Sequence, residues 1–449
     1  MSDFAQQALE RASRALELAL TAGAESAEVL GSSGSSALTR FAGNRIHQNV
    51  SETDTTVSVR AVVGTRVGVA STNRSDDVSL SACAQAALDA ARSAPEDPQF
   101  PGLPAPRVIE PVDRGVQATR DYDAGARAAA VRSIIDQSSS RGLTAAGGVK
   151  VTDEGIAVVN SLGVSASGSI TGIRATVLSM SPNGGSGWAS FVSSDASQLA
   201  AAALGDEAAT LAERSEGAGE LPEGAYTVVL APEAVSDIVD FMGYLAFGAK
   251  PVHEGRSFMA GHLGEKLLDE KVTITDDALS AHSLGLTFDF EGQPRQRVSL
   301  IEAGVARAFV TDSAWAARMD TGNTGHALPA PNSYGPLPLN LEMAGGDATI
   351  DQLISSVSRG VYVTRFHYVN VEDPIPVTLT GMTRDGTFMI ENGKLTRPLK
   401  NLRFTQSMTG ALSHVGGVTR ERRFIGAESS PTLVPGLLLE KFRFTGQTS

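Results

Sequence analysis

The sequence has 449 residues, of which 42% are hydrophobic and 19% are charged, so it can bury more than one core. At about 150 residues per domain, two or three domains are expected. With 37 basic and 50 acidic side chains the formal net charge is −13, which disfavours binding to nucleic-acid phosphates. A single cysteine, Cys83, excludes an internal disulfide, a cysteine-based zinc cluster and a paired redox motif.

The sequence leads us to expect no targeting segment. The N-terminal segment has no basic stretch followed by an apolar core, and no apolar run approaches the ~20 residues that a bilayer helix requires. We therefore expect a soluble protein that is not exported and that functions in the cytoplasm, where a lone thiol stays reduced.

The first part of the chain predicts strands between two amphipathic helices. Ser2 or Asp3 can cap the first helix, and helical spacing places Cys83 on the buried stripe of the second, where an inert core thiol is expected. The predicted elements are a helix at 2–21, strands at 27–30, 37–50 and 55–70 with a Gly-Ser turn at 31–36, and a helix at 75–92.

Prolines and glycines divide the middle of the chain. Six prolines between Pro95 and Pro111 predict a long surface connection, because proline suits neither a helix interior nor a central strand. A Gly-rich stretch at 216–222 predicts the boundary between an N-terminal domain, 1–220, and a C-terminal domain, 221–449. Between the Pro-rich and the Gly-rich stretches we expect a helix at 123–140, strands at 150–160, 165–180 and 187–193, and an Ala-rich helix at 196–215.

The C-terminal half is predicted to be mostly β. A buried strand at 224–230 precedes a helix that has Pro232 in its first turn and runs to about residue 247. The fold class is therefore α+β, with an N-terminal antiparallel sheet carrying helices and a β-rich C-terminal domain. Further short strands are predicted at 272–275, 287–290, 306–310, 361–364, 376–380, 387–390 and 394–399.

Common catalytic motifs are missing. The sequence contains neither a P-loop nor a nucleophile elbow. The seven histidines are too dispersed for two rings to face one ion from adjacent helical turns. The nearest approach is His253, Glu254 and His262, but glycines interrupt the interval, so a divergent metal site and a solvated loop both stay open there.

Four C-terminal segments, taken in order, resemble the TldD/TldE (PmbA) family. They are GRSFMAGHLGEK (255–266), DTGNTGH (320–326), SRGVYVT (358–364) and IENGKLTRPL (390–399). The N-terminal stretch RFAGNRIHQ (40–48) is similar to an early strand motif of the same family. The resemblance covers nearly the whole chain and implies the fold of that family and a role related to cytoplasmic metallopeptidases.

The zinc motif of the TldD branch has no counterpart here. In that branch a helix carries H-E-x-x-x-H shortly before the Gly-x-Ser segment, and a cysteine near the C-terminus completes the site. The corresponding interval reads DFMGYL (240–245), and the region expected to hold the cysteine, 407–416, contains none. Phe, Leu and Met offer zinc no suitable donor. The chain thus resembles the TldE branch, which implies that it binds no metal or other cofactor and carries no catalytic residue.

The resemblance also implies a partner. A TldD-type subunit would supply zinc, and this chain would help to close a chamber for unfolded peptides, which extended strands can bind through main-chain hydrogen bonds. No membrane or nucleic-acid partner is expected, and the chain can form a homodimer when alone. The candidate substrate-binding residues are Phe366, His367, Tyr368, Asn323 and His326. Alternatively, these residues pack in the core, lie at a subunit interface or belong to a solvated loop.

Two further functions stay open. One is an independent metal-dependent hydrolase that uses His253, Glu254 and His262. The other is a homodimeric peptide-binding or scaffold protein. Asp237 and Asp240 can share a helix face, but like charges at this spacing are usually solvated, so we do not predict an acid and base pair there.

Overall fold

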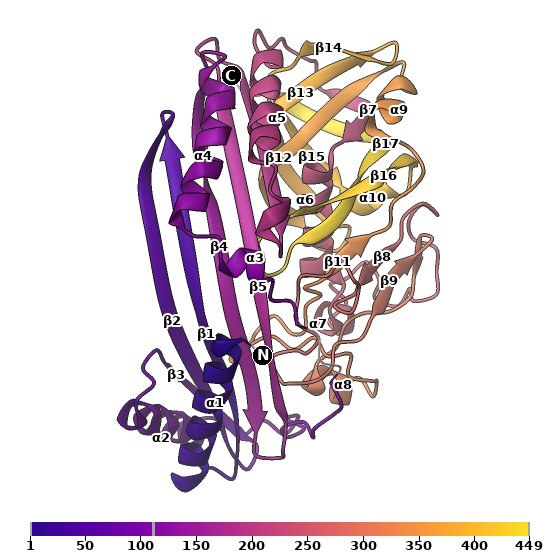
Figure 1. Ribbon diagram of the computed structural model, residues 1–449. Helices are drawn as coiled ribbons and strands as arrows, with labels where there is room; N and C mark the ends of the chain where they lie inside the picture. The colour runs from indigo at the N-terminus through magenta and orange to yellow at the C-terminus, as the bar shows by residue number, and fades with distance from the viewer. Residues whose placement is uncertain (1, 110–112, 448–449) are drawn as a thin grey trace.

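The computed structural model describes residues 2–109 and 113–447. The N-terminal half forms a long sheet, and the C-terminal half packs against one of its faces (Figure 1). None of the helices in the described ranges is both long enough and apolar enough to cross a bilayer.

The long sheet runs in the order β3-β2-β1-β4-β5-β6, and all neighbouring strands in it are antiparallel. This confirms the predicted antiparallel N-terminal sheet. Its strands are β1 (Ser26–Ala42), β2 (Arg45–Val63), β3 (Arg66–Thr72), β4 (Thr144–Asn160), β5 (Ser165–Met180) and β6 (Ser186–Ser193).

The predicted turn at 31–36 is wrong, because β1 runs straight through it. The glycines there permit close packing instead of a turn. A Cβ on Gly31 would lie 2.6 Å from the carbonyl oxygen of Ala8, and one on Gly34 would lie 2.7 Å from that of Asp153. Glycine in a strand interior can mark such a close approach of backbones as well as a bend.

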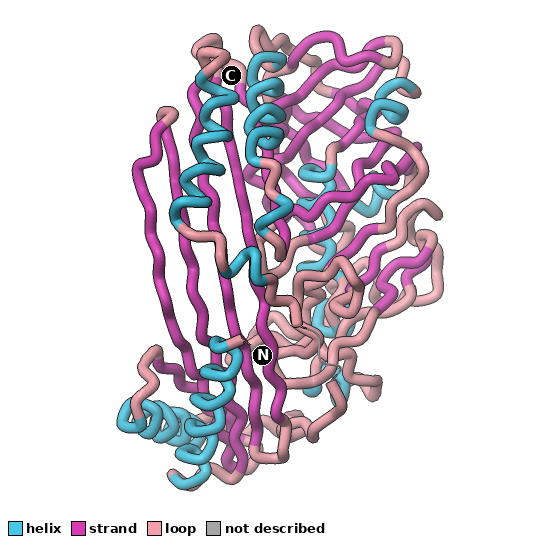
Figure 2. Tube along the Cα trace, in the orientation of Figure 1, coloured by secondary structure: helices cyan, strands magenta, loops and turns pink. Residues whose placement is uncertain are grey.

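Helices cover one face of the long sheet, and the C-terminal half covers part of the other. Figure 2 shows α1, α4 and α5 on the near side of the strands. Each predicted helix forms within a few residues of its expected ends, and Ser2, Asp76 and Asp123 cap the first three long ones. The helices of this half are α1 (Asp3–Thr21), α2 (Asp77–Ser93), α3 (Gln117–Arg120), α4 (Ala124–Ser139), a 3₁₀ turn (Ala196–Gln198) and α5 (Ala201–Arg214).

The Pro-rich stretch 95–109 forms neither helix nor strand and is mostly exposed, while Pro111 lies outside the described residues. Cys83 is buried on α2, and burial raises the pKa of its thiol, which suits an inert core residue. The stretch 216–222 lies between α5 and the first strand of the second sheet, and the domain division there stays a prediction.

The second sheet closes on itself. Its path runs β10-β9-β8-β11-β17-β15-β13-β12-β7, and β7 also pairs with β17, so five strands from β17 to β7 form a ring. The strands are β7 (Gly224–Leu230), β8 (Ile274–Asp276), β9 (Val298–Glu302), β10 (Val305–Ala306), β11 (Leu341–Met343), β12 (Arg359–Asp373), β13 (Thr378–Glu391), β14 (Lys394–Pro398), β15 (Leu402–Ser407), β16 (Val415–Ile425) and β17 (Thr432–Gln447).

The C-terminal half is β-rich as predicted, but its individual strands differ from the prediction. The predicted strands 376–380 and 387–390 are parts of one strand, β13, and 287–290 is irregular. The longest missed strand is β17, whose first eight residues are all buried and therefore lack the alternation that marks a half-exposed strand. The remaining helices are α6 (Pro232–Ala246), α7 (Ala249–His253), α8 (Ser313–Arg318), α9 (Ile350–Ser355) and α10 (Met408–Leu412).

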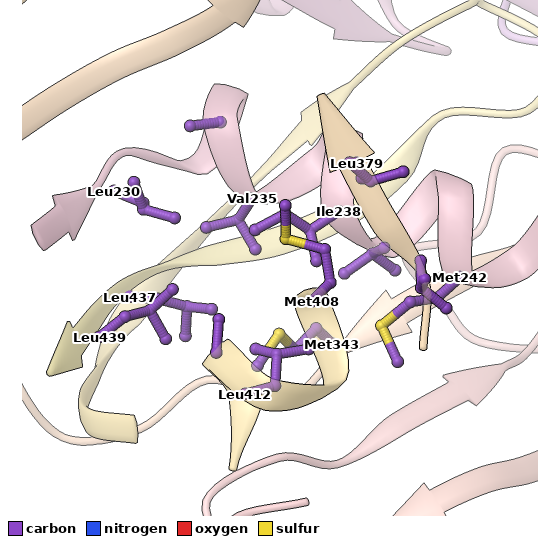
Figure 3. Packing of buried hydrophobic residues seen from close by; sticks show 14 of the residues in the cluster. Leu230, Val235, Ile238, Met242, Met343, Leu379, Met408, Leu412, Leu437 and Leu439 are labelled. Carbon is purple, nitrogen blue, oxygen red and sulfur yellow. The ribbon is translucent and has the colours of Figure 1, made fainter. Parts of the chain in front are cut away.

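The largest core lies between α6 and the ring. Figure 3 shows Val235 and Ile238 of α6 on the same side of the core as Leu437 and Leu439 of β17, while Met242 lies at the other end of the cluster, toward Met343. Burial of apolar area at about 25 cal/mol per Å² makes this contact a principal source of stability for the C-terminal half.

The packing of α1 on the sheet gives a test of the N-terminal half. A Cβ on Gly155 of β4 would lie 2.1 Å from the amide nitrogen of Ala5, which is backbone and cannot rotate away. We expect Gly155→Ala to lower the free energy of unfolding by about 1–3 kcal/mol through overpacking, measured by urea denaturation. Gly322→Ala is the matched control, because nothing lies within 4 Å of the added methyl group, and equal effects of the two changes would contradict the prediction.

Candidate functional site

One face of α6 is polar and lies opposite its buried face. Glu233, Asp237, Asp240 and Tyr244 follow one another at intervals of four, three and four residues, so they share one side of the helix. Pro232 occupies the first turn, where its missing amide is not needed. The apolar side that fixes this orientation comprises Ala234, Val235, Ile238, Val239, Met242, Leu245 and Ala246.

A cavity of about 400 Å³ adjoins the N-terminal end of this helix face. Its walls come from both halves of the molecule: α5 and β6 on one side, and α6, β12 and β16 on the other. The side chains that define its chemistry are Trp188, Glu207, Glu233, Tyr362, Arg365 and Arg423.

Arg423 connects the two halves at this cavity. Its Nη1 lies 3.0 Å from a carboxylate oxygen of Glu207 and 3.0 Å from one of Glu233, and its Nη2 donates to the carbonyl of Ser190 at 3.0 Å. The Glu233 side chain is only 9% exposed, so this guanidinium compensates a carboxylate that water does not solvate.

Arg365 forms the second charged contact. Its Nε donates to Asp385 Oδ2 at 2.9 Å, and its guanidinium carbon lies 4.7 Å from the ring centre of Trp188. Asp385 also accepts from Ser186 of β6 at 2.6 Å. Both arginines are therefore held in place, and the cavity has a fixed polar rim over an aromatic wall.

Burial alters the acidity of several groups here. Burial, and then the neighbouring Asp240, raises the pKa of Asp237 to about 7, while Arg365 opposes the shift. Burial followed by the charge of Glu233 raises the pKa of Tyr362, so its phenol stays protonated. Asp237 is half-buried beside Asp240, so it is less solvated than the sequence led us to expect.

The interval 240–245, which the resemblance set against the zinc motif of the TldD branch, lies on α6. Asp240 is exposed and accepts a hydrogen bond from Thr432, Phe241 is half-buried, and Leu245 is buried. Segment 407–416 packs through α10 against the buried side of α6 (Figure 3), so the chain next to Asp240 is the start of β17. Within 2–109 and 113–447, no three His, Cys, Asp or Glu side chains are grouped to hold a metal ion.

Consecutive residues of β12 have different surroundings. Phe366 is 3% exposed, and its ring centre lies 4.5 Å from that of Phe404 in the core, so burial favours the core role that the sequence left open. His367 is half-buried, and Tyr368 is 76% exposed with a φ of +55°. Burial, then Arg384 and Arg365, lowers the pKa of His367.

The loop at 320–326 places its two candidates differently. His326 is fully buried, with Nε2 at 2.8 Å from Asp276 Oδ1 and Nδ1 at 2.9 Å from Thr324 Oγ1, so its ring supports the loop and cannot reach a peptide. Asn323 is half-buried, and its amide donates to Ser313 at 2.9 Å.

The alternative metal residues contact different partners. The His253 ring packs edge-on against Trp315 at 5.6 Å, Glu254 pairs with Arg256, and His262 Nδ1 lies 3.0 Å from Glu265 Oε2. The structure thus does not group these three side chains around one point.

Comparison with models of known protein families identifies the family of this chain. The PmbA/TldA metallopeptidase domain 1 model matches residues 27–93, and the PmbA/TldA metallopeptidase C-terminal domain model matches residues 223–446. The chain belongs to the PmbA/TldD family. The resemblance seen in the sequence is thereby confirmed.

Individual relatives align with this chain over less than half of their own length. A "Metalloprotease TldD homolog" of Buchnera aphidicola subsp. Acyrthosiphon pisum is 31% identical over 33% of this chain and 31% of its own. A "Metalloprotease" of Methanothermobacter thermautotrophicus is 26% identical over 45% of this chain and 44% of its own.

Solved structures share the fold over almost the whole length of this chain. TldE from Thermococcus kodakarensis superposes with a TM-score of 0.87 at 16% identity and covers 97% of this chain and 100% of its own. A putative modulator of a DNA gyrase from Thermotoga maritima gives 0.84 at 18% identity, covering 97% and 99%. At these identities the comparison establishes the fold.

Sequence reasoning missed most of the cavity. Trp188, Glu207, Tyr362 and Arg423 come from four elements, and no local pattern marks residues that meet only after the two halves pack. The one local signal was the spacing of acidic residues along α6, from Glu233 to Asp240, on an otherwise apolar helix.

The contact of Arg423 with Glu233 generates a prediction. We expect Arg423→Gln to lower the free energy of unfolding by roughly 1–2 kcal/mol, because it leaves a buried carboxylate without its cation. Chemical denaturation measures the loss. Adding Glu233→Gln to this variant should recover part of it, while Arg403→Gln, at an exposed position on β15, should cost much less.

Proposed function

We propose that this chain is the metal-free, non-catalytic subunit of a TldD/TldE-type cytoplasmic peptidase complex. A TldD-type partner would hold the zinc and supply the reacting groups. The chain would help to enclose unfolded peptides during their degradation or processing.

The observation that carries this proposal is the composition of the α6 face. Asp240, Phe241 and Leu245 stand where the TldD branch has its ligands and base, and only Asp240 has an oxygen donor. Activation of water by zinc in peptidases requires three protein ligands around the ion. A single exposed carboxylate that accepts from Thr432 does not meet that requirement.

Two surfaces suit an extended peptide or a partner strand. Residues 45–56 of β2 extend past the pairing with β3, which covers only residues 57–63, and nearly all of them are exposed (Figure 1). A free strand edge can accept main-chain hydrogen bonds from another strand. On the C-terminal half, His367 and Tyr368 could contact the side chains of a bound peptide.

Reconstitution with a TldD-type subunit tests the proposal. We expect the two proteins to co-elute in size-exclusion chromatography and to cleave an unfolded peptide, with zinc analysis assigning about one ion to the partner and none to this chain. Full cleavage by the partner without this chain, or a failure of the two to associate, would contradict a subunit role.

Metal analysis of the isolated chain separates the remaining functions. Near-stoichiometric zinc that is lost in His253→Ala would favour an independent hydrolase. A stable homodimer that binds peptides but gains no activity from any TldD-type subunit would favour a scaffold.

A further inference from the structure

A second charged cluster joins the two halves of the molecule away from α6. Arg60 of β2 extends from the long sheet, and its Nη1 donates to Glu28 Oε1 of β1 at 3.1 Å and to Glu291 Oε1 at 3.2 Å. The three side chains are 14%, 5% and 9% exposed. One guanidinium therefore compensates two buried carboxylates that belong to different halves.

Two more buried carboxyl groups lie at this contact. Asp289 is 1% exposed and accepts from the amides of Glu291 and Ala327. Asp312 is 7% exposed and caps α8 by accepting from Trp315 at 2.8 Å. The other carboxylate oxygen of Glu291 accepts from the amide of Ser313, directly after Asp312, so the four acidic side chains share one network.

Other charged groups around the network do not balance it. Arg295 is 5% exposed and favours the ionised form of Asp289, but its guanidinium donates to the carbonyl of Phe288 and also interacts with Asp276, which contacts His326. Neighbouring elements contribute Asp97, Lys250 and Arg318 to the wall of an adjacent cavity of about 600 Å³. Among the described residues, Arg60 is the only cation that forms ion pairs with carboxylates of the network.

Protonation offers a way to relieve the excess charge. Burial raises the pKa of Glu28 to about 7, with Arg60 opposing the shift and Glu291 adding to it. Burial followed by Glu291 raises the pKa of Asp289 to about 7. Burial also raises the pKa of Asp312 to about 6, against the Trp315 amide. In mild acid, protonation of these three carboxyl groups removes much of the excess negative charge around Arg60.

We propose that Glu28, Arg60, Asp289, Glu291 and Asp312 form a pH-dependent latch between the long sheet and segment 287–327. The latch is closed in mild acid and loosens in mild alkali, when four carboxylates face one guanidinium without water to solvate them. The cavity of about 600 Å³ is lined by residues from both sides of this contact, so loosening widens it.

The direction of the pH effect follows from proton linkage. A carboxyl group whose pKa is raised by folding binds more protons in the folded form, so its contribution to stability declines as the pH rises through the folded value. The latch therefore weakens as the pH rises from about 4, the ordinary carboxyl value, to about 7, and the last part of this decline falls between pH 6 and pH 8. This is opposite to a salt-bridged carboxylate of lowered pKa, which loses stability on acidification.

Hydrogen exchange measured by mass spectrometry tests the latch in the intact chain. After correction for intrinsic rates, we expect peptides covering 26–31, 57–63 and 287–296 to open at least about tenfold more often at pH 8 than at pH 6, since one pKa unit corresponds to a tenfold change. Peptides from the α6 core should change little. Protection that is equal at both pH values in the three latch peptides would overturn the proposal.

Two neutral isosteres identify the groups responsible. Glu28→Gln should reduce the difference between pH 8 and pH 6 in those peptides about tenfold, whereas Asp312→Asn should reduce it about twofold, because the pKa of Asp312 is raised only to about 6. Asn caps a helix as well as Asp does, so Asp312→Asn keeps α8 intact and stays informative if Glu28→Gln folds poorly. Glu52→Gln makes the same change on the exposed part of β2 and should leave the difference unaltered. A pH dependence that persists undiminished in both latch variants would also overturn the proposal.

Discussion

The burial of one face of α6 against the closed ring is the constraint on which the rest of the molecule depends. Apolar residues from Ala234 to Ala246 fill that contact, so the polar side of the helix must face the junction with the long sheet. This orientation of α6 sets the positions of its acidic residues, of the adjoining cavity, and of Arg365 and Arg423. A helix rotated by one residue would expose Ile238 or Met242 and bury a carboxylate without a partner.

Local patterns predicted the elements of this fold better than their contacts. Helical spacing located α1 and α2, a capping residue marked the start of α1, and Pro232 marked the start of α6, since these signals lie within a few residues of sequence. They failed for β17, whose buried run has no alternation, and for β1, where glycines accommodate close packing. The contact of Arg423 with Glu207 spans 216 residues, so it depends on the packing of the two halves and left no mark in either segment.

Membership of the PmbA/TldD family accounts for the fold of this chain but does not by itself define the chemistry of α6. The fold is shared with solved structures at 16–21% identity, which indicates that the arrangement of sheets tolerates extensive substitution. In this chain α6 has an apolar side and carries carboxylates and Tyr244 on the other. A scaffold can therefore persist while the residues for the reaction change.

The pairing of β17 has a consequence for how the chain is made. This strand pairs with β7, β11, β15 and β16, and all four precede it in the sequence. The long sheet is complete by β6 and can form while translation continues, whereas the ring cannot close until its last strand leaves the ribosome. Until then the apolar side of α6 lacks Leu437 and Leu439, so an incomplete C-terminal half leaves part of this core uncovered.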